Sequence, residues 1–101
     1  MKVIISQTVY FDEDNGRFPH SWNKEVESEM MPHVGDSIED SIWEDGGPYE
    51  VIESIINYQE NYCYVVVKEL DYRIPKGREE EFAHMAELHE WKPLWGKNFL
   101  K

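Results

Sequence analysis

The chain has 101 residues and a net charge of −11, with 41% hydrophobic and 14% aromatic residues. This length fits one domain with a modest core, and the composition is that of a folding chain rather than a disordered one. The charge argues against direct binding to nucleic acid or to an anionic membrane, because both affinities depend on Lys and Arg.

The first part of the chain, residues 1–73, has the pattern of a β-rich segment. Strands are predicted at 2–11, 23–31, 37–43, 49–58 and 62–70, where β-branched and aromatic residues are frequent or alternate with polar ones. In 23–31, three Glu alternate with mostly apolar residues, and a short helix that ends before Pro32 is the alternative. Turns or loops are expected at 12–22, 32–36 and 44–48, and residues 59–61 close a hairpin.

The hydrophobic period changes from strand-like to helical after Pro75. A helix is predicted over 77–91, with Gly77 as its N-cap and with Phe82, Met85, Ala86 and His89 on one apolar stripe. The tail, 93–101, is apolar and basic and is expected to pack onto the fold or onto another copy of the chain. The predicted class is α+β and mainly antiparallel, a single domain in which about five strands form a small SH3-like barrel or curled sheet with a C-terminal helix.

One stretch of the sequence is similar to a loose group of small proteins from bacteria and their phages. Residues 30–70 contain Pro32, Gly35 and Asp36, then the run Gly47-Pro48-Tyr49-Glu50-Val51 and the alternating strand 62–67. This order resembles the pattern P-x-x-G-D, strand, G-x-Y-x-V, strand of those uncharacterised β-barrel proteins. The resemblance implies a small barrel and a bacterial or phage origin, and it implies no activity.

Residues that could carry chemistry are few. Glu80, His84 and Glu87 share one face of the predicted helix and are weak candidates for a metal site, but no second motif completes their coordination shell. Cys63 and His89 fit buried or core-edge positions better than catalytic ones. Because the single cysteine cannot form an internal disulfide and no signal peptide is evident, we expect a cytoplasmic protein. Since the candidates above are weak, we expect no cofactor and no catalytic residue.

The acidic residues gather in the middle of the chain. No Lys or Arg occurs between Glu25 and Val67, and that window holds eleven carboxylates, whereas the other residues carry ten acids and ten bases. Such a window could serve solubility alone, but a soluble surface usually mixes both signs. Acids without nearby bases repel one another and destabilise the fold. A window that carries this cost is more readily explained as a binding face than as a solubility device.

We therefore expect the binding site at an acidic loop. Its predicted charged residues are Asp40, Glu44, Asp45 and Glu50, with Glu39 and Glu53 adding to the field, and its predicted aromatic anchors are Trp43 and Tyr49. The predicted function is that of a small, acidic, non-enzymatic binding protein, phage- or prophage-encoded. It would engage a basic protein surface, such as a nucleic-acid-binding site that it mimics and blocks.

Two other classes of function remain open from the sequence. One is a self-associating structural or assembly subunit, in which the tail of one copy docks on the acidic sheet of the next. The other is a small metal-dependent enzyme that uses His84 and its neighbours. Concentration-dependent mass would support the former, and stoichiometric metal after purification the latter.

Overall fold

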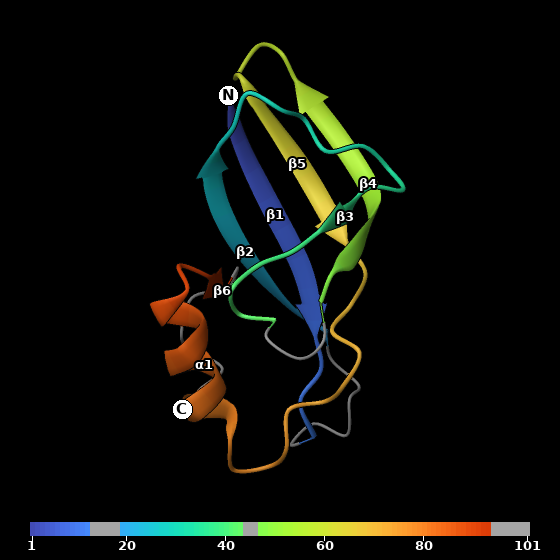
Figure 1. Cartoon of the computed structure of the whole chain (residues 1–101). Helices are drawn as coiled ribbons and strands as arrows, with labels where there is room; N and C mark the ends of the chain where they lie inside the picture. The colour runs from blue at the N-terminus through green and yellow to red at the C-terminus, as the bar shows by residue number, and fades with distance from the viewer. Residues whose placement is uncertain (13–18, 44–46, 94–101) are drawn as a thin grey trace.

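The computed structural model describes residues 1–12, 19–43 and 47–93, and within them the chain forms one curled sheet with one helix near its C-terminal end (Figure 1). The elements in chain order are β1 (Lys2–Val9), β2 (His20–Glu27), β3 (Ser37–Ile38), β4 (Tyr49–Asn57), β5 (Tyr62–Val67), α1 (Glu79–Leu88) and β6 (Lys92–Pro93). The predicted class, a mainly antiparallel curled sheet with a C-terminal helix, is confirmed.

The strands are ordered β3-β4-β5-β1-β2-β6 across the sheet. β1 lies in the middle, antiparallel to β2 and parallel to β5, and every other pairing is antiparallel. Its central place explains why β1 is largely buried on both faces, as its continuous apolar run indicates. The parallel β1–β5 pairing joins strands that are far apart in sequence, and it unites the β1–β2 pair and the β4–β5 hairpin in one open sheet.

Strand alternation gives the sheet an inner and an outer face. Val3, Ile5 and Val9 of β1 point inward with Cys63, Val65 and Val67 of β5, and all six are buried. The outer face carries the intervening residues in register, including Ile4, Tyr64 and Ile55 side by side. The inner face therefore forms the core, and the outer face carries the partly exposed positions.

Several element boundaries differ from the prediction. β2 begins at His20 rather than near residue 23, β3 is only two residues long, and β6 was not predicted. Both short strands are held by long-range pairing, β3 against the start of β4 and β6 against Trp22 and Asn23. Neither has enough residues to show a period of its own, so their formation depends on the neighbouring strand.

The helix is shorter than predicted at both ends. It starts after Arg78, while Gly77 has a φ of +89° and lies outside the helix. Phe82 and Ala86 are buried, but Met85 of the predicted apolar stripe is 39% exposed, and Leu88 is 70% exposed. A stripe of two buried residues is enough to hold so short a helix against Phe11 and Trp22. No helix among the described residues is long and apolar enough to cross a membrane.

A chain segment that crosses the inner face completes the fold. After β3, residues 39–43 run across the inner side of the sheet toward β2 and α1 before the chain returns to β4 (Figure 1). Trp43 packs against Tyr49 and Trp91, with ring centroids 4.8 and 5.6 Å away. These contacts place the predicted acidic loop partly inside the molecule.

Candidate binding surface

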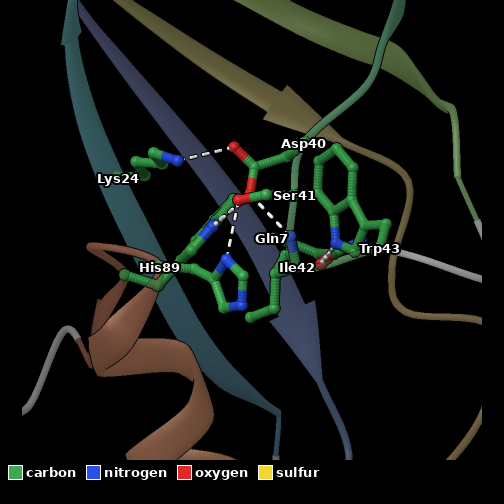
Figure 2. Close-up of polar contacts among 8 residues, drawn as sticks. Gln7, Lys24, Asp40, Ser41, Ile42, Trp43 and His89 are labelled. Atoms are coloured by element: carbon green, nitrogen blue, oxygen red, sulfur yellow. Dashed lines mark hydrogen bonds and ion pairs between the residues drawn. The ribbon is translucent and has the colours of Figure 1, made fainter.

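Asp40, at the start of the crossing segment, is the centre of a polar cluster (Figure 2). Its carboxylate accepts hydrogen bonds from Lys24 Nζ of β2 at 2.6 Å, from Trp91 Nε1 at 3.0 Å and from the backbone N–H of Ile42 at 3.1 Å. The side chains of Lys24 and Asp40 are only 12% and 10% exposed. The pair joins residues sixteen apart in the chain and fixes the crossing segment to the sheet.

The surroundings of Asp40 keep it ionised at neutral pH. Burial by itself raises the pKa of this carboxyl group, but the hydrogen bonds from Lys24, Trp91 and Ile42 together outweigh it and lower the pKa below its ordinary value. A carboxylate that is charged at neutral pH and accepts three hydrogen bonds is suited to holding the crossing segment in place.

Trp43 also attaches the crossing segment to the sheet, through hydrogen bonds deeper in the core. Its indole Nε1 donates to Gln7 Oε1 at 3.0 Å, and Gln7 Nε2 donates to the carbonyl of Lys68 at 3.0 Å. Gln7 is 3% exposed, so the two bonds satisfy a polar side chain that β1 buries. The chain from Trp43 through Gln7 to Lys68 links the crossing segment to β1 and to the end of β5.

A serine and a histidine meet at the edge of this cluster. The Ser41 hydroxyl lies 2.7 Å from Nδ1 of His89, the residue that follows α1 (Figure 2). The nearest carboxylate in sequence, Asp40, is bonded to Lys24 and Trp91 instead of orienting the imidazole. Nucleophilic catalysis requires a base that is oriented and an anion-stabilising site. The Ser41–His89 hydrogen bond attaches the crossing segment to the C-terminal end of α1.

These contacts change the interpretation of the predicted binding loop. Trp43 and Tyr49 are 7% and 5% exposed, so they are core residues and their expected role as surface anchors is wrong. Asp40 is likewise paired inside the molecule. Glu44 and Asp45 lie outside the described residues. Of the predicted site, Glu50 alone among the described residues projects a partly exposed carboxylate, 3.5 Å from Lys68 Nζ.

A signal for the inward position of Asp40 was present in the sequence. Lys24 is the one base on the apolar side of the alternating stretch 23–31, and β2 places it opposite Ile5 on the inner face. A charge at such a position requires a partner of opposite sign. The sequence does not indicate which of the many acids would supply it, because that depends on the crossing segment.

Several exposed acids of the window lie on or next to the paired strands β3 and β4. Ser37 pairs with Glu50, and the carbonyl of Asp36 accepts the Val51 N–H at 2.8 Å. Asp36, Glu39 and Glu53 are exposed and Glu50 is partly exposed. We call these four residues, Asp36, Glu39, Glu50 and Glu53, the acidic edge.

Apolar side chains lie among the carboxylates of the acidic edge. Val34, Ile52 and Ile55 are 64%, 49% and 49% exposed. Ile52 lies at a β-bulge between Val51 and Glu53, where one extra residue enters β4. Exposed apolar groups therefore stand beside exposed carboxylates in this part of the chain.

The weak metal candidates do not form a site in the described part of the chain. Glu80, His84 and Glu87 follow one another along α1, and no group of three His, Cys, Asp or Glu among the described residues could hold a metal ion. Cys63 is fully buried in β5, with Sγ 3.5 Å from the Ser54 hydroxyl. Its burial agrees with the structural role expected of it.

Comparison with protein-family models, with curated proteins and with solved structures finds no significant match to this chain. The similarity of residues 30–70 to small bacterial and phage barrel proteins therefore stays a prediction. Functional inference depends on the geometry of the chain itself.

Proposed function

We propose that this protein is a small, acidic, non-enzymatic binding protein whose acidic edge engages a basic surface of another protein. The observation that carries the proposal is that Asp36, Glu39, Glu50 and Glu53 lie with exposed apolar side chains along one edge of the sheet. Lys68 is the only base that a described ion pair brings to these four carboxylates, while Asp36 also lies near His33. A basic partner would be attracted by the net field and held by the apolar contacts.

The polar cluster around Asp40 supports this proposal indirectly. It fastens the crossing segment to β2, α1 and the core, so that β3 and the acidic edge have a fixed position. A preorganised surface loses less conformational entropy on binding than a loose one. The partner class includes nucleic-acid-binding proteins, whose basic sites would accept a protein that imitates a row of phosphates.

The test is capture of a partner from the native host at low salt. The Glu50→Lys/Glu53→Lys variant should lose the partner, because two charge reversals at a complementary interface slow association and weaken binding by several kcal/mol. The matched control, Glu80→Lys/Glu90→Lys, makes the same change in net charge on and just after α1, and should keep it. Raising the ionic strength should weaken wild-type binding.

Two results would contradict the proposed site. If both double variants keep the partner with unchanged affinity, the acidic edge does not bind it. If Glu44→Lys/Asp45→Lys loses the partner while the edge variant keeps it, the site is the loop that the sequence first suggested. A mass that rises with concentration and a self-complex that survives without other proteins would favour the self-associating subunit.

A further inference from the structure

The outer edge of β4 has backbone groups that the described residues leave unpaired. β4 runs from Tyr49 to Asn57, but β3 pairs only with its first two residues. Beyond them, Val51 donates its N–H to Asp36 and accepts from the Gly35 N–H at 2.9 Å. Past Val51, none of the described residues bonds to the outer backbone of the strand, although the Ser54 hydroxyl donates to the carbonyl of Pro32 at 2.8 Å.

The register identifies which groups are available. The backbone N–H and C=O of Val51 point away from β5, toward Asp36 and Gly35. Because Val51 lies opposite Val67, the N–H and C=O of Val67 point away from β4, toward β1. Because backbone direction alternates along a strand, Val65 and Cys63 also point toward β1. Their partners Ser54 and Ile56 therefore present N–H and C=O groups to the open side of β4.

We propose that this edge binds an extended basic segment of the partner as an added strand, with backbone hydrogen bonds to Ser54 and Ile56. The inference rests on the proposed function and specifies how the acidic edge would bind. Extended segments commonly bind to a free sheet edge, where main-chain bonds give affinity and side chains give specificity. Lys or Arg side chains of the added strand would meet Glu53 and Glu50, and an aliphatic one would cover the exposed Ile55.

Charge selects this occupant over a second copy of the chain. Two copies that paired through β4 would bring together edges with the same carboxylates on chains of net charge −11. Like charges across a strand pair are destabilising, and charged residues at sheet edges commonly block edge-to-edge association. The same carboxylates would attract a basic strand.

The experiment uses the intact protein and a capped synthetic peptide of alternating lysine and valine as the probe. A second peptide has the same sequence and charge but is N-methylated at alternate residues, which removes the backbone donors on one edge. Binding is measured by isothermal titration at low salt, and amide hydrogen exchange of the protein is followed with and without peptide. We expect the methylated peptide to bind at least about tenfold more weakly, from the loss of two or more backbone hydrogen bonds.

Hydrogen exchange provides the second criterion. The amides of Ser54 and Ile56 should become protected when the unmodified peptide binds, while exposed amides of α1 stay unchanged. Equal affinity of the two peptides without that protection would overturn strand addition and leave the acidic edge as a purely electrostatic surface. Failure of the unmodified peptide to bind would also overturn it, and the capture experiment above would then decide the proposed function separately.

Discussion

Replacing Asp40 by Asn tests whether the crossing segment is held by its ionic pairing. The substitution keeps the shape and can keep an acceptor for Trp91 and Ile42, but it leaves the Lys24 ammonium, 12% exposed, without its anion at 2.6 Å. Breaking a fully buried pair costs about 3–5 kcal/mol. Because water reaches part of both side chains here, we expect a loss of about 2–4 kcal/mol, from that range reduced for partial exposure.

The assay is chemical and thermal denaturation followed by tryptophan fluorescence and circular dichroism. For a domain of this size the expected loss corresponds to a fall in Tm of roughly 10–20 °C. The control is Asp36→Asn, since Asp36 is exposed and its carboxylate bonds the His33 N–H at 2.8 Å on the surface. Its effect should stay near 0.5–1 kcal/mol, about the value of one exposed hydrogen bond.

A double-mutant cycle separates pairing from general disruption. With Lys24→Met added, the Asn at position 40 no longer faces an unpaired ammonium, so the double variant should be less destabilised than the sum of the two single variants. Additive effects within about 0.3–0.5 kcal/mol would refute the reasoning that the pair holds the segment. A loss below about 1 kcal/mol for Asp40→Asn would refute it as well.

Acid provides an independent check on the same carboxylate. The pKa of folded Asp40 lies below the ordinary value of 3.8 that the unfolded chain would show. Its contribution to stability is therefore complete above the unfolded pKa and is lost as the pH falls through the folded one. Wild type should lose more stability than Asp40→Asn between neutral pH and the acid limb below pH 3.8.

Three further predictions concern other parts of the core. Burial raises the pKa of Tyr49 to about 12, so spectrophotometric titration should show one tyrosine that ionises well after pH 10. The free energy of unfolding should fall above pH 10, because there only the unfolded chain ionises this tyrosine. Tyr49→Phe should abolish both effects, and a normal tyrosine titration would contradict the burial of this ring. Cys63 is 0% exposed, so the native protein should react with a thiol reagent only as fast as it opens, and denaturant should release one reactive thiol; prompt reaction without denaturant would be inconsistent with the core position. Phe82→Ala should cost about 3 kcal/mol through loss of its contacts with Phe11 and Trp22, whereas Met85→Ala, at a position 39% exposed, should cost less than about 1 kcal/mol; equal effects in denaturant titrations would mean that α1 packs differently.

The fold determines which carboxylates of the acidic window face outward. The sequence shows where the acids gather along the chain and suggests a loop around Asp40, Glu44, Asp45 and Glu50. The fold divides them, since Asp40 turns inward to Lys24 while Glu50 and Glu53 stay at the outer side of β4. Counting charges along a chain therefore gives the total charge of a segment and not the face of the protein on which that charge lies.

The predicted aromatic anchors show the same limit. Trp43 and Tyr49 flank a charged loop, and such residues often occupy the centre of an interface. Here the buried Trp43 ring packs against the rings of Tyr49 and Trp91. Side chains so large are buried wherever a neighbouring segment offers apolar area, and the position of that segment is a tertiary property.

By itself, the sequence determined what short-range patterns encode. The continuous apolar run of β1, the alternation in β5, the hairpin turn that ends at Asn61 with a φ of +58°, and the change of period before α1 are local signals, and each of these elements formed within the range predicted for it. The tertiary structure alone decided the parallel pairing of β1 with β5, the short strands β3 and β6, and the union of Asp40 with Lys24 and Trp91. These features join residues that are distant in the chain. They are stable because the curled sheet buries the surface and satisfies the polar groups that such residues share. Local propensity does not encode these long-range contacts.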